Sequence, residues 1–214
     1  MIVPLKIDIG AATVHGAMMP PDGVDKGLVV FVHGSGSSRH SPRIRAMARG
    51  LQAEGFGALL LDLLSTHEER IDARTGGYRL DVEFLAARLV HSLDRVWLGQ
   101  GLQAMPVGLL GSGRGAAVAL LAAARVPHMV RAVVSHSGRP ELAGAALTRV
   151  RAPTLFVVDE RDEHLLELNH NAAALMVAHD VRTVPGADHV ESDAHTLEQV
   201  TKYAGEWFTH HVRW

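Results

Sequence analysis

Short runs of apolar residues alternate with longer amphipathic stretches along most of this chain, and this order constrains the fold more than any other feature. Leu28–Val32 is the clearest run, because every residue in it is apolar. A strand that is apolar throughout is typical of a parallel sheet covered by helices on both faces. Similar runs follow at Ala58–Leu61, Val107–Leu110, Ala132–Val134 and Thr154–Val158, with a shorter candidate at Val181–Val184.

The amphipathic stretches between these runs predict helices. Strands that alternate with helices favour right-handed crossover connections and a mainly parallel, doubly wound sheet. The expected helices cover about Pro42–Glu54, Leu80–Trp97, Arg114–Arg125, Leu165–Ala178 and His195–His210.

The start of the chain follows a different pattern. Val3–Ile9 and Ala12–Met18 alternate between apolar and polar residues and are separated by Gly10, which predicts an antiparallel hairpin. With the buried runs, this hairpin makes a sheet of about eight strands whose first two form an antiparallel edge.

Composition narrows the classes of partner and chemistry. The 214 residues suit one α/β domain, 1–214, and the net charge of −2 is spread along the chain, so we expect no nucleic-acid partner. The chain has no cysteine, which excludes disulfides and a thiolate nucleophile. Its start lacks the zones of a signal peptide and no apolar run is long enough to cross a bilayer, so we expect a cytoplasmic protein without membrane contact.

The segment that carries chemical information follows Val107–Leu110. It reads Gly111-Ser112-Gly113-Arg114-Gly115 and leads into a predicted helix. A strand, a tight turn flanked by glycines and a helix are typical of the nucleophile elbow, Gly-x-Ser-x-Gly, in which small flanking residues let helix and strand approach closely. Gly111 and Gly115 take the flanking positions, so Gly113 stands where the serine is expected.

On these and other residues the chain resembles the small α/β-hydrolases related to dienelactone hydrolase, in particular the group often fused to phosphoribosyltransferase domains. The resemblance covers nearly the whole chain and implies the α/β-hydrolase fold. No insertion between Ser137 and Arg151 is long enough for a cap domain, so none is expected. The matching segments are His33–Pro42, the elbow, Ser137–Pro140, Arg151–Thr154, Asp162 with Leu166–Asn169, and Pro185–His189.

The resemblance also implies the roles of individual residues. Asp162 matches the acid of the catalytic triad, and His189 matches the base, in the chain order expected of this fold. The oxyanion hole would use the backbone N–H groups of Ser35 and Arg114, since rigid backbone donors suit a developing negative charge.

Glycine at position 113 departs from the family pattern. Without a hydroxyl the acyl-enzyme route is closed, so we expect ordinary serine-esterase activity to be reduced or absent, although the ligand should still be a small ester or other carbonyl compound. No cofactor is expected. Two alternatives stay open: His189 and Asp162 act as a general base without a serine, or the protein binds its ligand without catalysis.

Neighbouring polar residues offer competing interpretations. Ser112 precedes the apex, so its side chain should point away from the histidine. Ser135 and Ser137 are expected to form hydrogen bonds in a loop. Asp159 and Glu160 are alternative acids, although the resemblance favours Asp162.

Other motifs carry less weight. Gly111–Ala116 also fits Gly-x-Gly-x-x-Ala, a dinucleotide fingerprint, and Arg139 would then face a 2′-phosphate, but no acid follows the next strand to hold a ribose. The 14 histidines form no recognised metal motif, so no metal is expected. The polar stretch Ser65–Tyr78 is expected to be a solvated loop, with a place on the pocket rim as the alternative.

Overall fold

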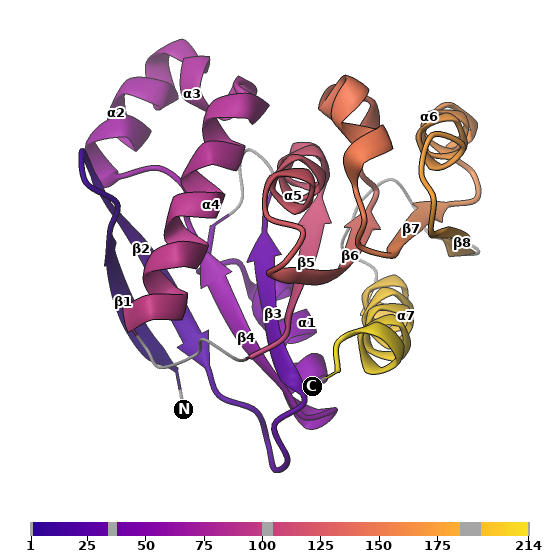
Figure 1. The fold of residues 1–214 in the computed structure, drawn as a ribbon, viewed down its shortest axis with the longest axis horizontal. Coiled ribbons are helices and arrows are strands. Elements are labelled where there is room, and N and C mark those ends of the chain that lie inside the picture. The colour runs from indigo at the N-terminus through magenta and orange to yellow at the C-terminus, as the bar shows by residue number, and fades with distance from the viewer. Residues whose placement is uncertain (1, 34–37, 100–104, 185–193, 214) are drawn as a thin grey trace.

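One mixed sheet organises the computed structural model, which describes residues 2–33, 38–99, 105–184 and 194–213. Its strand order is β1-β2-β4-β3-β5-β6-β7-β8, and the strands follow one another in this order across Figure 1. The strands are β1 (Val3–Asp8), β2 (Thr13–Met19), β3 (Gly27–Val32), β4 (Phe56–Leu61), β5 (Val107–Ser112), β6 (Val130–His136), β7 (Thr154–Asp159) and β8 (His179–Val184).

Strand direction confirms the expected architecture. β1 and β2 pair as an antiparallel hairpin, and β2 runs antiparallel to β4. From β4 to β8 all neighbours are parallel. The carboxyl ends of these parallel strands therefore share one edge of the sheet, where ligands of α/β proteins collect.

Helices cover both faces of the sheet. The five that the amphipathic pattern predicts are α1 (Pro42–Ala53), α4 (Val82–Gly99), α5 (Arg114–Arg125), α6 (Glu163–Ala173) and α7 (Ala194–His211). Side chains of α4, α5 and α6 join one apolar cluster, and those of α1 and α7 join a second. The alternation within β3 explains both clusters, since Val30 enters the first while Val29 and Phe31 enter the second.

The stretch after β4 corrects one prediction. Ser65–Tyr78 was expected to be a loop, but it contains α2 (Thr66–Thr75), and α3 (Gly77–Leu80) follows directly. Ser65 and Glu68 form a capping box at the start of α2: the Glu68 N–H donates to Ser65 Oγ at 3.3 Å, and the Ser65 N–H donates to Glu68 Oε2 at 2.8 Å. Ser-x-x-Glu was thus the missed signal in the sequence.

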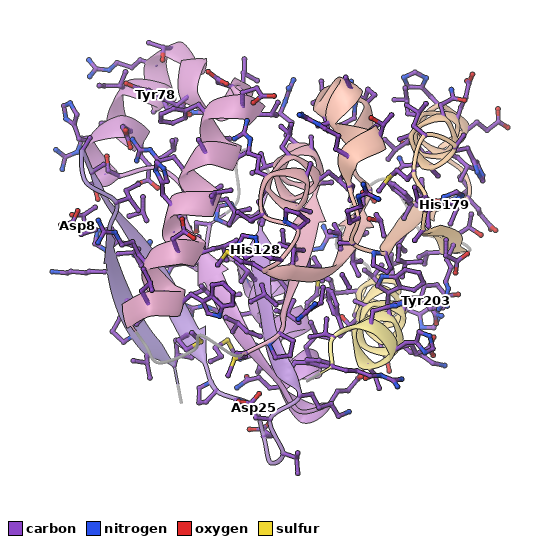
Figure 2. The ribbon with its side chains drawn as sticks, in the orientation of Figure 1. Asp8, Asp25, Tyr78, His128, His179 and Tyr203 are labelled. Atoms are coloured by element: carbon purple, nitrogen blue, oxygen red, sulfur yellow. The ribbon has the colours of Figure 1, made fainter. Side chains whose placement is uncertain are left out.

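Polar and aromatic contacts hold α2 and α3 against α4. Glu68 forms an ion pair with Arg88 of α4. The ring of Tyr78, labelled at the top of Figure 2, lies 5.4 Å from that of Phe84, centroid to centroid. These contacts position the helix pair above the carboxyl end of β4, where it can line a site.

The connection between β6 and β7 is a short helical segment, η1 (Pro140–Arg149), which sequence periodicity did not reveal. It has 3₁₀ geometry and is kinked at Gly144. Its Ala143, Ala146 and Leu147 are buried in the same cluster as α5. The segment therefore packs on the sheet domain and forms no cap.

Within the part of the chain that the structure describes, no helix combines the length and the apolarity that a membrane span requires.

Removing the capping hydroxyl should weaken α2. Ser65→Ala is expected to lower the free energy of unfolding by about 1 kcal/mol, because the Glu68 N–H loses its acceptor. Urea denaturation followed by circular dichroism measures this change. Thr66→Ala, at an exposed position of the same helix, is the control and should cost less than about half as much. A Ser65→Ala protein as stable as the control contradicts the capping role.

Candidate active site

The bend between β5 and α5 lies at the carboxyl edge of the sheet. Gly113 forms its apex with φ 54° and ψ −124°, a conformation that side-chain-bearing residues adopt only under strain. The Gly113 N–H donates to the carbonyl of His136 at 3.3 Å, and the Gly113 carbonyl accepts from the Arg139 N–H at 2.9 Å. Main-chain hydrogen bonds to the end of β6 therefore hold the bend.

The flanking glycines make the bend sterically feasible. A Cβ at Gly111 would lie 2.6 Å from the Gly115 carbonyl oxygen, and a Cβ at Gly115 would lie 2.1 Å from the Val32 carbonyl oxygen. Both distances are far below van der Waals contact with backbone atoms that cannot move freely. The elbow spacing in the sequence thus reflects the close approach of α5 to β5 and β3.

No described residue crowds the apex: within residues 2–33, 38–99, 105–184 and 194–213, a Cβ built on Gly113 has no heavy atom within 4 Å beyond its chain neighbours. Gly113 is also the N-cap of α5 and provides no capping side chain. In the first turn the Ala116 N–H donates to the Gly113 carbonyl at 3.2 Å, and the positive end of the helix dipole lies at the apex.

The predicted acid lies on the loop that follows β7. Asp162 is the N-cap of α6, and its Oδ1 accepts a hydrogen bond from the Leu165 N–H at 2.9 Å. The alternative acid Asp159 instead accepts from the Arg161 N–H at 2.9 Å. Both Asp162 and Glu160 follow β7, which is the second strand from β5 in the sheet.

Two predicted members of the site, Ser35 and His189, lie outside the described residues. The structure therefore brings Gly113 and the Arg114 N–H together at the apex and leaves the full arrangement as a prediction.

The three serines near the apex, Ser112, Ser135 and Ser137, differ in their hydrogen bonding and surroundings. Ser112 ends β5 opposite His136. The Ser135 hydroxyl was expected to form a hydrogen bond, but it is buried without a partner among the described residues, so that expectation is wrong. Its space is taken by the close approach of Gly138, where an added Cβ would lie 2.1 Å from Ser135 Oγ. Ser137 has φ 42° and donates its backbone N–H to the Val157 carbonyl at 2.9 Å.

An ionic cluster at the ends of β3 and β4 was not predicted. His33, which follows β3, places Nε2 2.9 Å from Oδ1 of Asp62, which follows β4. The same carboxylate also accepts the backbone N–H of Arg39 at 2.8 Å and pairs with the Arg39 guanidinium. A single aspartate after an apolar strand forms no recognisable motif, so only its position at the shared carboxyl edge pointed to it.

This cluster adjoins a pocket of about 450 Å³. The lining includes His15 of β2, Arg39, Asp62, and Thr66 and Glu69 of α2. The α2 helix therefore forms part of the wall of this pocket; a place of the Ser65–Tyr78 stretch on the rim of the pocket at Gly113 stays a prediction.

The described ranges contain no group of three or more histidine, aspartate or glutamate side chains that could hold a metal ion.

His136, at the end of β6, has a pKa far below the ordinary value for histidine. Burial, together with the positive charge of Arg43, lowers the pKa of its imidazole to about 3. The ring is therefore neutral at physiological pH, next to the backbone that holds Gly113.

Comparison with known proteins gives a family and several relatives. A family model described as "alpha/beta hydrolase fold" matches residues 27–201. A dienelactone hydrolase from Anabaena variabilis has 39% sequence identity and a TM-score of 0.95, with 100% of this chain and 99% of that chain covered. Est1E from Butyrivibrio proteoclasticus has the same fold at 16% identity and a TM-score of 0.76, covering 97% of this chain and 98% of that chain.

Curated relatives are longer. Proteins from two strains of Mycobacterium tuberculosis, each named putative phosphoribosyl transferase, are 44% identical to this chain over 209 residues. The match covers 97% of this chain and 46% of each relative. The chain thus spans about half the length of the curated relatives it matches.

The two glycines of the bend should tolerate substitution very differently. Gly115→Ala forces a Cβ onto the Val32 carbonyl and is expected to lower the free energy of unfolding by at least about 3 kcal/mol. The added Cβ of Gly113→Ala meets no described residue beyond its chain neighbours, so the expected cost is that of the positive φ, about 1 kcal/mol. Urea denaturation of both variants measures the difference, and equal losses would show that steric contact does not govern the bend.

The buried imidazole should make stability depend on pH. The folded pKa of His136 lies below the ordinary value of 6.5, so the unfolded chain binds a proton that the folded chain does not. Stability contributed by neutral His136 is present above about pH 6.5 and falls by about 1 kcal/mol on going to about pH 5.5. His136→Asn should remove this part of the slope in unfolding experiments across that range. An unchanged slope would mean that His136 is not buried as a neutral ring.

Proposed function

The chain belongs to the α/β-hydrolase superfamily, among its dienelactone hydrolase-like members, and on that premise we propose that it binds a small ester or other carbonyl compound with ordinary serine-esterase activity reduced or absent. The observation that supports this proposal is Gly113, which forms the apex of the glycine-flanked bend between β5 and α5 with φ 54° and ψ −124° and carries no hydroxyl. We infer the ligand class from the esterase-like ancestry of the family. The missing hydroxyl at residue 113 is the reason to expect reduced or absent serine-esterase activity.

The proposed site has four further members. Asp162 is the acid, His189 is the base, and the backbone N–H groups of Ser35 and Arg114 form the oxyanion hole. In an intact triad the base removes the proton of the serine as its oxygen attacks the carbonyl carbon, while the acid orients the imidazole. With glycine in place, no oxygen of the protein attacks and no acyl-enzyme forms.

What remains can still bind the ligand. The α5 helix begins at the apex without a side-chain cap, and the positive end of its dipole favours a carbonyl oxygen that carries partial negative charge. Sites that lose one triad member retain on the order of a thousandfold rate enhancement over water, because positioning and oxyanion donors survive. A small residual turnover is therefore compatible with the proposal.

A second candidate function is hydrolysis by a water molecule that His189 activates. The observation that favours it is that, in the part of the chain that the structure describes, no residue beyond the chain neighbours lies within 4 Å of a Cβ built on Gly113, so these residues leave room there for a nucleophile that is not part of the protein. General-base catalysis needs only a base within hydrogen-bond reach of that water.

The names of the longer relatives cannot be transferred to this chain, because the match covers less than half of each of them. Phosphoribosyl transferase is the name of proteins about twice as long as this chain, and the match covers 46% of each. We therefore propose the hydrolase-type function for residues 1–214, taken as one domain, and extend no transferase activity to it.

Restoring the hydroxyl tests the assembled site. Gly113→Ser should react with a fluorophosphonate probe, while the native protein should not, because the apex then carries a nucleophile beside the base. Adding His189→Ala to Gly113→Ser should slow labelling by at least about a hundredfold. Gly113→Ala is the control and should remain unlabelled.

The same experiment separates the candidates. Labelling of the native protein would reject the proposed role of Gly113. Failure of Gly113→Ser to react, with the variant folded, would show that the acid, base and oxyanion donors are not assembled around the apex. Slow ester turnover by the native protein that disappears in His189→Ala would favour the activated-water candidate.

A further inference from the structure

The strand at one end of the sheet, β8, has a side that no described strand uses. Within residues 2–33, 38–99, 105–184 and 194–213, β7 is the only strand that pairs with β8, and Figure 1 shows β8 at the end of the sheet. An edge strand presents N–H and C=O groups that can pair with another strand. The backbone and side chains of β8 therefore decide which partner fits this edge.

The backbone groups of β8 point alternately to β7 and to the outer side. The Ala178 carbonyl accepts from the Thr154 N–H of β7 at 3.0 Å, so the even-numbered residues are those that bond to β7. The Val181 N–H instead donates to Oδ1 of its own neighbour Asp180 at 2.9 Å. The outward groups are thus those of the odd-numbered residues, His179, Val181 and Thr183.

The spacing of these outward groups lets two copies of β8 pair with each other. In an antiparallel pair centred on Val181, the Val181 N–H of each copy donates to the Val181 carbonyl of the other. His179 of one copy then lies opposite Thr183 of the other, and their backbone groups form the next hydrogen-bonded pairs. A two-fold axis at Val181 therefore satisfies the outward groups of both strands at once.

The side chains between these positions are self-complementary in charge. In the same arrangement Asp180 lies opposite Arg182 of the other copy, twice by symmetry, where side chains of an antiparallel pair approach most closely. Both are accessible, since the Asp180 side chain is 45% and the Arg182 side chain 32% exposed. Arg182 is held beside the edge by Glu206 of α7 at 2.9 Å and by the ring of Tyr203, which Figure 2 labels.

The opposite end of the sheet is unsuited to such pairing. In the hairpin the Ile9 N–H donates to the Ala12 carbonyl, so the odd-numbered residues of β1 bond to β2. The outward groups of β1 are thus those of Pro4, Lys6 and Asp8. Proline has no N–H to donate, and a pair centred on Lys6 sets two like charges opposite each other. Of the two edges, only β8 is complementary to itself.

We propose that the partner of the β8 edge is a second copy of this chain, joined by antiparallel pairing of the two β8 strands about Val181. In the single chain the Asp180 carboxylate caps the outward Val181 N–H. In the pair, the Val181 carbonyl of the other copy takes this N–H, and the carboxylate pairs with Arg182 of the other copy. The inference concerns assembly and does not depend on the chemistry at Gly113.

The mass of the native protein in solution is the first test. Sedimentation velocity between about 1 and about 100 μM should show a species of two chains whose share grows with concentration. A single-chain species throughout this range would overturn the proposal.

A proline at the centre of the strand tests the backbone pairing. Val181→Pro removes the central outward N–H, so the dissociation constant of the pair should rise at least about tenfold. Val181→Thr keeps this N–H and a branched side chain, and it should stay within about threefold of the native value. Because the Val181 N–H is not part of the ladder to β7, the proline leaves that ladder in place. Equal dissociation constants for the two folded variants would contradict the proposed pairing.

Charge variants test the same interface if the proline variant does not fold. Asp180→Arg sets arginine opposite arginine, and Arg182→Asp sets aspartate opposite aspartate, so each variant alone should associate at least about tenfold more weakly. Mixed in equal amounts, they should form a pair of one chain each, because every arginine then faces an aspartate. A mixture that stays as single chains, with both variants folded, would overturn the proposal.

The edge at β1 provides the matched control. Lys6→Glu also reverses a charge on an edge strand, but it should leave the dissociation constant unchanged within about twofold. Loss of association in Lys6→Glu, with β8 intact, would show that the copies meet at a different edge.

Discussion

The close approach of α5 to β5 and β3 is the constraint on which the rest of the structure depends. Two residues without side chains, Gly111 and Gly115, bring the helix backbone into contact with the strands, and no larger residue fits at either place. This contact sets the direction of α5 and points its N-terminus at the carboxyl edge of the sheet. Neighbouring parallel strands end at the same edge, and His33, Asp62 and Asp162 follow three of them there.

The sheet and its covering helices could be predicted because the signals are local and repeated. An entirely apolar strand such as β3 indicates burial on both faces, and the two clusters confirm it. The pair α2 and α3 was missed because its surface is polar and its stability comes from a capping box and from ion pairs with partners such as Arg88. Glu68 and Arg88 are 20 positions apart in the sequence, so the periodicity of apolar residues does not reveal the ion pair between them.

The candidate site could be predicted only in part, for the same physical reason. The glycine spacing located the apex at Gly113, because the two residues that must lack a side chain, Gly111 and Gly115, each lie two positions from it. Asp62 had no comparable signal: its partners His33 and Arg39 come from another strand end, and they meet only when β3 and β4 pair. For Ser135 the sequence predicted a hydrogen bond that the structure does not contain. Its hydroxyl is packed against Gly138 and buried without a hydrogen-bond partner among the described residues.

The main-chain hydrogen bonds that hold Gly113 to β6 have an evolutionary consequence. Because His136 and Arg139 use backbone atoms to fix the bend, its shape does not require any particular apex side chain. Glycine and serine codons can be exchanged by a single-base substitution. A substitution at residue 113 can therefore change the side chain at the apex while the main-chain hydrogen bonds that hold the bend stay in place.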